Sequence, residues 1–257
     1  MTDSLAEYVA LGSSFGAGPG LKPRAANSPR RSGRSVINYA HLFAQAAQLR
    51  LRDVTFSGAT TADLLRPNAR GEAAQLNAVT PATRVVTMSV GGNDVGYLPT
   101  LTLSSLPGPL LALPRVRRQL EEARDPHRLD RAFDDLAARL AEIVTRVRAV
   151  APEARVVFVD YLTILPPQGA AVDLGRLPAP VADWGRGVAS RLTQTFRSAA
   201  AEVSSDVLPA AEASANHHAW STEPWTRRFH YGLSGGAPYH PNAAGMRAVA
   251  RMLGELL

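Results

Sequence analysis

Residues 8–20 read Y-V-A-L-G-S-S-F-G-A-G-P-G, and this stretch decides the fold. Its first four residues form a short apolar run, which predicts a buried strand. Gly12 ends the run, and Ser13 and Ser14 follow it directly. A hydroxyl at the end of a buried strand is presented at the edge of a sheet, beside backbone N–H groups of the next turn. Such a place suits a serine nucleophile, although Gly-Ser pairs also form ordinary tight turns.

Four more strands and a series of helices are predicted along the chain. Apolar, β-branched runs predict strands at residues 51–56, 83–90, 155–160 and 206–208. Helical spacing of apolar residues predicts helices from Tyr39, from Thr60 (with Asp63 as a capping box), and over residues 128–150, 184–203 and 242–257. Alternating strands and helices predict an α/β fold, a three-layer α/β/α sandwich on a mainly parallel sheet of about five strands, as one domain over residues 1–257.

The composition limits the kinds of site that this chain can form. With 257 residues, 46% of them hydrophobic, it can bury a sizeable core, and without cysteine it has no disulfide or thiolate metal site. No cofactor is predicted. The net charge of +6 comes almost wholly from arginine, since Lys22 is the sole lysine. Residues 24–34 hold the densest basic cluster, which we interpret as a solvated loop in preference to an anion site.

The location of the protein is predicted from what the sequence lacks. No run of 18 apolar residues is present, and the first strand begins about seven residues after Met1, which leaves no room for a secretory signal before it. A cytoplasmic location is therefore expected, with a secreted mature form left open. The expected partner is a small-molecule or lipid acyl ester; no nucleic-acid partner is expected, and the oligomeric state is not predicted.

Glycine-containing turns follow the first three predicted strands. They are G-S-S at 12–14, S-G-A-T-T at 57–61 and G-G-N-D at 91–94. In a parallel sheet these turns meet at the carboxyl edge, where α/β proteins bind ligands. Residues 98–114 are apolar, but their prolines exclude one long helix, so they form either a core-packing loop or an acyl-binding rim or lid. The long connection 209–239 is also typical of a functional loop.

With H-P-N-A-A-G at 240–245, these turns resemble the four sequence blocks of the SGNH hydrolases, also called the GDSL esterase/lipase family. The blocks are A-L-G-S-S-F, S-G-A-T-T-A-D-L-L, V-G-G-N-D and Y-H-P-N-A-A-G, in this order. R-S-V-I-N-Y and V-D-Y-L-T-I-L-P are similar to the branch with bacterial lipases and phospholipases. The resemblance implies the flavodoxin-like fold of that family and a carboxylic ester hydrolase that forms an acyl-enzyme without a cofactor.

Matching the blocks gives each candidate residue a role. Ser14 corresponds to the nucleophile and His240 to the base that takes the serine proton and returns it to the leaving alcohol. The backbone N–H groups of Ser14 and Gly58 and the side-chain amide of Asn93 correspond to the oxyanion hole. One such donor contributes about 3–4 kcal/mol in acyl transfer.

Two departures from the family pattern leave choices open. Ser13 replaces the aspartate of the first block, so Ser13 and Ser14 compete for the role of nucleophile, and the alignment favours Ser14. Ala237 stands where the family usually has the aspartate three residues before the histidine. We therefore predict a Ser-His pair in which the carbonyl of Ala237 orients the imidazole. The alternative is a carboxylate from elsewhere in the chain: Asp160, Asp183, Asp206 or Glu223.

Three alternative functions are left open by the sequence. An acyltransferase or deacetylase would share the site, and competing alcohols would separate acyl transfer from hydrolysis. A phosphate-binding protein could use Gly16, Gly18 and Gly20, but their spacing does not match G-x-G-x-x-G and Pro19 removes one N–H. Nucleic-acid binding through arginines is the third. Four of the remaining histidines, His41, His127, His217 and His218, are predicted to be structural, and Asp94 and Tyr97 are predicted to brace the loop of Asn93.

Overall fold

Five parallel strands form one sheet in the order β2-β1-β3-β4-β5. This arrangement comes from a computed structural model, which describes residues 5–68, 71–232 and 235–257. The strands are β1 (Glu7–Gly12), β2 (Arg50–Asp53), β3 (Thr83–Ser89), β4 (Arg155–Val159) and β5 (Asp206–Leu208). The predicted mainly parallel sheet of about five strands is therefore confirmed.

Strand β1 lies between β2 and β3, and its four apolar residues, 8–11, have no exposed surface. Its last residue, Gly12, pairs with Ser89, so the turns after β1 and β3 begin side by side. Strand β2 is shorter than predicted. Its regular pairing with β1 ends at Asp53, whose carboxylate accepts the backbone N–H of Thr55 at 3.0 Å and its hydroxyl at 2.6 Å. The backbone N–H groups of Val54 and Phe56 still donate to the carbonyls of Ala10 and Gly12, at 3.0 and 2.9 Å.

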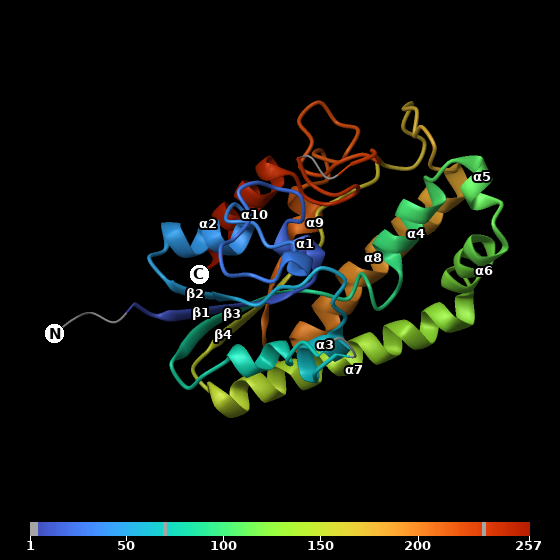
Figure 1. Cartoon of the computed structure of the whole chain (residues 1–257). Helices are drawn as coiled ribbons and strands as arrows, with labels where there is room; N and C mark the ends of the chain where they lie inside the picture. The colour runs from blue at the N-terminus through green and yellow to red at the C-terminus, as the bar shows by residue number, and fades with distance from the viewer. Residues whose placement is uncertain (1–4, 69–70, 233–234) are drawn as a thin grey trace.

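Helices cover both faces of the sheet, as the three-layer prediction requires (Figure 1). On one face lie α2 (Tyr39–Ala46) and α10 (Ala243–Leu256), which pack against each other. On the other face lie α3 (Thr61–Leu65), α7 (Pro126–Val150) and α8 (Ala179–Glu202). Because successive crossovers use opposite faces on the two sides of β1, the turns at its carboxyl end lie open between the layers.

The long helices begin earlier than predicted because prolines occupy their first turns. Asp125 caps α7 by accepting the Arg128 N–H at 2.8 Å, and Pro126 follows at the first helical position, where no donor is needed. One stripe of α7 is buried, as its periodicity predicts: Phe133, Leu136, Leu140, Ile143, Val144 and Val147. These side chains join one contiguous core with the strands.

The proline-rich stretch 98–114 contains no long helix, in agreement with the prediction, but three short ones. They are α4 (Tyr97–Ser104), α5 (Gly108–Leu111) and α6 (Pro114–Ala123). Pro109 and Pro114 each lie in the first turn of a helix, so prolines start helices here as well as ending them.

The remaining short elements are α1 (Ser14–Ala17), α9 (Ala210–Ala213) and the 3-10 turns η1 (Arg30–Ser32) and η2 (Gln75–Ala78). Among its described residues, 209–232 and 235–239, the predicted long connection holds one helix, α9, besides turns and a β-bridge from Thr226 to Pro241. Within residues 5–68, 71–232 and 235–257, no helix combines the length and apolar character needed to cross a membrane.

Candidate active site

The backbone at Gly12 brings Ser14 to the carboxyl edge of the sheet. Gly12 has a φ of +140°, and a Cβ atom there would lie 2.4 Å from the carbonyl oxygen of Ser89. Only glycine can therefore end β1 in this way. Ser13 continues in an extended conformation, and Ser14 begins α1 with 8% of its surface exposed.

Ser14 and His240 are 226 residues apart in the sequence and meet at this edge. The imidazole Nε2 lies 2.7 Å from Ser14 Oγ, and Nδ1 lies 2.7 Å from the carbonyl oxygen of Pro238. Because a carbonyl oxygen only accepts, Nδ1 donates its hydrogen to Pro238, which leaves Nε2 as the acceptor for the Ser14 hydroxyl. This is the tautomer that a general base acting on Ser14 needs.

The carbonyl that orients the imidazole belongs to Pro238, so the prediction of Ala237 is wrong by one residue. The carbonyl of Ala237 accepts the backbone N–H of His240 at 3.3 Å, in a turn where Tyr239 has a φ of +60°. That turn directs the Ala237 carbonyl at the main chain and leaves the Pro238 carbonyl facing the ring. The predicted kind of orienting group, a backbone carbonyl, is the one found.

None of the four alternative carboxylates hydrogen-bonds to His240 in the part of the chain that the structure describes. Asp160 accepts the Tyr161 N–H and the Thr193 hydroxyl, and burial raises its pKa to about 6. Two others pair with arginines, Asp183 with Arg186 and Asp206 with Arg155. Glu223 contributes its backbone carbonyl to His217.

The imidazole of His240 is held neutral by its surroundings. Burial lowers its pKa below the ordinary value of 6.5, while the hydrogen bond to Pro238 acts in the opposite direction. The ring is 9% exposed and stacks obliquely near Phe15, with ring centroids 6.1 Å apart. A neutral imidazole at pH 7 is free to accept a proton, which a charged one is not.

The competing hydroxyl of Ser13 points elsewhere. Ser13 is 1% exposed, its backbone N–H donates to the Ser89 carbonyl at 2.9 Å, and its Oγ donates to the same oxygen at 3.4 Å. Among the described residues, the hydroxyl that reaches His240 is that of Ser14. Of the two candidates, Ser14 alone is therefore placed for proton transfer to the imidazole.

Three hydrogen-bond donors at this edge have capacity to spare. In the described part of the chain, no acceptor binds the backbone N–H of Ser14 or Gly58. The Asn93 amide donates one hydrogen to the Ala59 carbonyl at 2.8 Å, and its second hydrogen remains available. Gly58 has a φ of +82° with no atom within 4 Å of a Cβ position, so it is its backbone conformation that calls for glycine.

Asp94 ties the loops of Gly58 and Asn93 together, which agrees with the bracing role predicted for it. Its carboxylate accepts the backbone N–H of Thr61 at 3.0 and 3.1 Å and the hydroxyl of the same residue. Arg139 lies 3.8 Å from the carboxylate. Two of the candidate donors are thus held on one rigid unit.

Two supporting contacts have no signal in the sequence. Gln75 in η2 clamps Gly12: its Oε1 accepts the Gly12 N–H at 2.7 Å and its Nε2 donates to the Gly12 carbonyl at 3.0 Å. The hydroxyl of Tyr161 accepts the Gly92 N–H at 2.8 Å, and the Tyr161 ring packs on the Phe15 ring with centroids 4.6 Å apart. Both contacts join segments far apart in sequence, so no local pattern marks them.

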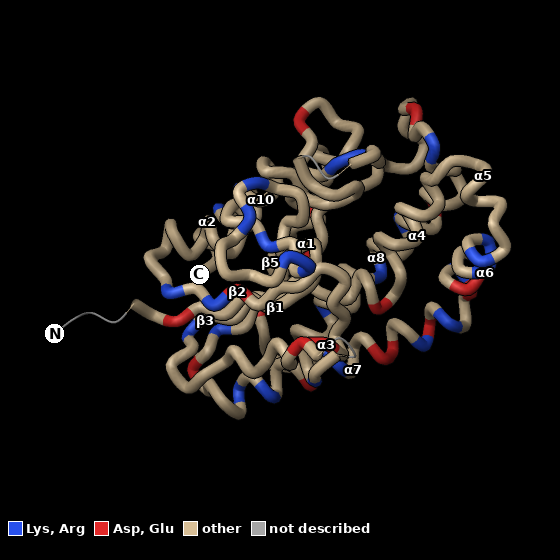
Figure 2. Tube along the Cα trace, in the orientation of Figure 1, with Lys and Arg blue, Asp and Glu red and all other residues tan. Residues whose placement is uncertain are grey.

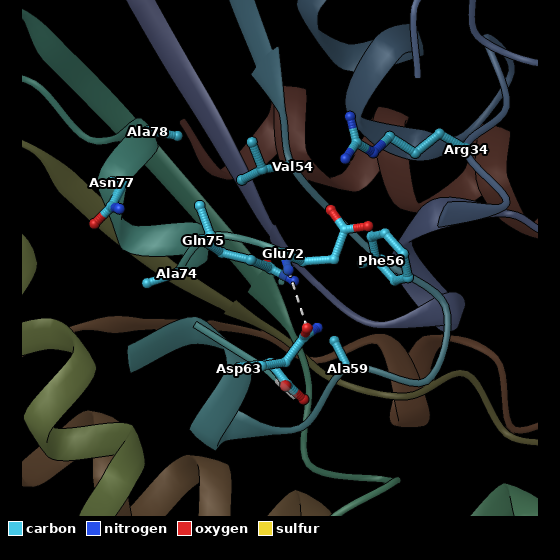
Figure 3. Close-up of a pocket in the computed structure, with 12 residues that line it drawn as sticks. Arg34, Val54, Phe56, Ala59, Asp63, Glu72, Ala74, Gln75, Asn77 and Ala78 are labelled. Carbon is cyan, nitrogen blue, oxygen red and sulfur yellow. Dashed lines mark hydrogen bonds between the residues drawn. The ribbon is translucent and has the colours of Figure 1, made fainter. Parts of the chain in front are cut away.

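A cavity of about 300 Å³ lies beside the loop of Phe56 and Ala59, and Figure 3 shows the residues that line it. Its wall includes Phe56, Ala59 and Gln75, and its polar lining includes Arg34 and Glu72. Ser14 and His240 do not line it. The cavity therefore adjoins the supports of the site without opening onto the Ser-His pair.

The other features singled out in the sequence lie apart from the pair. In the basic stretch, Arg24 donates to Ser28 and Arg34 donates to the Thr55 carbonyl, so both guanidinium groups hold loops in place. His217 stacks on Trp225 with centroids 4.0 Å apart. Across the described residues, no group of three or more His, Asp or Glu side chains could hold a metal ion.

The chain is similar to known lipases over nearly its whole length. Residues 10–248 match the GDSL-like Lipase/Acylhydrolase family. Lipase 2 of Streptomyces coelicolor is 33% identical over 261 residues, which cover 98% of this chain and 85% of that protein. The structure of phospholipase A1 from Streptomyces albidoflavus superposes with a TM-score of 0.78 at 27% identity, covering 98% and 99% of the two chains. An extracellular lipase from Streptomyces rimosus gives 0.77 at 24%, covering 98% and 100%.

Proposed function

The chain belongs to the GDSL-like lipase/acylhydrolase family and is a serine ester hydrolase, and from this premise we propose that Ser14 and His240 carry the reaction. The observation that supports the proposal is the 2.7 Å contact between Ser14 Oγ and His240 Nε2. No carboxylate serves as a third member: the Pro238 carbonyl, 2.7 Å from Nδ1, fixes the tautomer and stabilises the imidazolium.

The reaction proceeds in two halves. Ser14 Oγ attacks the ester carbonyl carbon while its proton passes to His240 Nε2, and the carbonyl oxygen becomes an oxyanion. The carbon–oxygen bond to the alcohol then breaks, and the alcohol leaves with the proton from Nε2. Water attacks the acyl group on Ser14 in the second half, giving a proton to His240. Collapse of that intermediate releases the acid, and the proton returns to Ser14 Oγ.

The oxyanion is bound by the backbone N–H groups of Ser14 and Gly58 and by the second hydrogen of the Asn93 amide. No other acceptor among the described residues binds these three hydrogens, which supports this role because donors already in place need no rearrangement when the charge forms. Asp94 and Gln75 hold the loops that carry these donors.

The proposed substrate is a lipid acyl ester. The phospholipase A1 from S. albidoflavus, whose fold this chain shares over nearly its whole length, is one relative that acts on a lipid. The stretch 98–114 combines the two predicted alternatives: Leu98 and Leu101 pack in the core, and residues 106–113 are not buried. The unburied part follows the rim alternative, which favours an acyl group longer than acetyl. Cytoplasmic location stays a prediction, and the S. rimosus relative is described as extracellular.

A series of p-nitrophenyl esters with increasing acyl length tests this function. We expect hydrolysis with kcat/KM rising from acetate to medium-length chains, because a longer chain buries more apolar surface against the protein. With glycerol present, free acid should remain the main product; a predominant new ester would identify an acyltransferase instead. Failure to cleave every ester in the series would contradict the proposed activity.

A further inference from the structure

Residues 106–113, between α4 and α6, form an exposed apolar tip. Their sequence is L-P-G-P-L-L-A-L, without a polar side chain. None of the eight residues is buried, and α5 within them has no buried residue. Leu110 is 43% exposed and Leu113 is 48% exposed. A run of eight apolar residues left in contact with water calls for a function, whereas single exposed apolar side chains do not.

The other large exposed apolar side chains of the described residues are scattered along the chain: Leu5, Val150, Val172, Tyr231 and Leu257. The tip differs because its leucines adjoin one another and prolines fix its backbone. Pro107 precedes α5, and Pro114 opens α6, which is anchored to the protein by the buried Leu120. The tip is thus exposed on a stable support.

Positive charge follows the tip directly. Arg115 and Arg117 are exposed in the first turns of α6, and neither forms an ion pair with any described residue. The acidic residues of this helix come at its other end, where Glu122 pairs with Arg118 at 2.8 Å and with Arg128 at 2.9 Å. Figure 2 shows the same order, with blue positions on α6 before the red ones. Apolar side chains beside unpaired arginines are complementary to an anionic lipid surface.

The tip adjoins the catalytic loop. Ser105, the residue before it, has its hydroxyl 2.6 Å from the hydroxyl of Tyr239, and both side chains are buried. Tyr239 precedes His240 in the chain. The base of the tip is therefore tied by a hydrogen bond to the loop that carries His240.

We propose that residues 106–117 dock the enzyme on anionic phospholipid bilayers: Leu110 and Leu113 enter the interface, and Arg115 and Arg117 bind the anionic headgroups. Docking would bring lipid esters to Ser14, and this role rests on the proposed ester hydrolysis. The binding itself does not require turnover, so the two are tested separately.

The test measures binding of the Ser14→Ala protein to sedimented vesicles. Vesicles of phosphatidylcholine with about 30 mol% of the anionic lipid phosphatidylglycerol are compared with vesicles of phosphatidylcholine alone. On the anionic vesicles, Leu110→Asp with Leu113→Asp should weaken binding about tenfold or more. Replacing Arg115 or Arg117 with Gln should weaken binding to the anionic vesicles about fivefold each. Added salt should also weaken the binding of the parent protein to these vesicles. On phosphatidylcholine the arginine changes should have little effect.

Val150→Asp, made in the same background, is the matched control. Val150 is 42% exposed at the end of α7, far from α5 in Figure 1, and should bind like the parent. Unchanged melting temperatures verify that the variants fold. Equal binding by the tip variant and the parent overturns the proposal, as does a preference for neutral vesicles. The proposal is also overturned if gel filtration shows that the parent is a dimer and the tip variant a monomer, because the tip is then a self-association surface. Hydrolysis of soluble p-nitrophenyl esters by the wild type, measured in parallel, reports on the proposed function alone.

Discussion

Ser14→Ala is expected to lower kcat for ester hydrolysis by about 10⁴-fold or more, because it removes the atom that forms the acyl-enzyme. Ser13→Ala should change kcat by less than about tenfold, since the lost hydroxyl bonds to the Ser89 carbonyl and to Tyr161 and not to His240. The measurement is steady-state hydrolysis of one soluble p-nitrophenyl ester by both variants, side by side with the wild type.

The two serines control for each other because they are adjacent and both buried. A variant that loses activity by misfolding should also lose thermal stability, so melting curves accompany the kinetics. The reverse pattern, with Ser13→Ala inactive and Ser14→Ala active, would move the nucleophile by one residue and break its contact with His240.

His240→Ala should produce a loss of similar size, about 10⁴-fold in kcat, because a nucleophile and its base act as one unit. Neutralising any of the four carboxylates that could compete for the imidazole should lower kcat by less than about tenfold, since a group that does not touch the ring cannot orient it. The changes are Asp160→Asn, Asp183→Asn, Asp206→Asn and Glu223→Gln, each measured with the same ester as His240→Ala.

The carboxylate series separates a Ser-His pair from a triad. In a triad, removal of the orienting carboxylate costs about 10⁴-fold in kcat. A loss of that size in one of the four variants, with an unchanged melting temperature, would show that a carboxylate reaches His240 during the reaction. The Pro238 carbonyl would then be an orienting group of the resting enzyme alone.

Much of the fold follows from local pattern. The apolar run 8–11 and the stripe of α7 are buried as their periodicity predicts, because removing apolar side chains from water drives the packing of both elements. The errors are at element ends. The regular pairing of the predicted strand 51–56 ends at Asp53, although Val54 and Phe56 still donate to β1. Helix α8 begins five residues before the predicted 184, after Pro178, and apolar spacing does not record this start.

In the candidate site, too, some features follow from the sequence pattern and others do not. Sequence blocks identify Ser14 and His240, and the structure places these two side chains in contact. The family pattern predicts the orienting carbonyl at Ala237 because it counts residues, whereas the left-handed turn at Tyr239 decides which carbonyl faces the ring. The Gln75 clamp on Gly12 and the bond between Ser105 and Tyr239 join residues 63 and 134 positions apart, beyond the reach of any local pattern.

The central claim is that neutral His240 activates Ser14, and the pH dependence of labelling by a serine-reactive phosphonate tests it most directly. Burial lowers the pKa of His240 below the ordinary value of 6.5. The imidazole can accept the serine proton above this lowered pKa and is already protonated below it. We predict an adduct on Ser14, located by peptide mass spectrometry, whose rate of formation rises with pH through one inflection below 6.5 and is lost in His240→Ala. An adduct on another serine, or a Ser14 adduct whose rate is independent of His240, would contradict it.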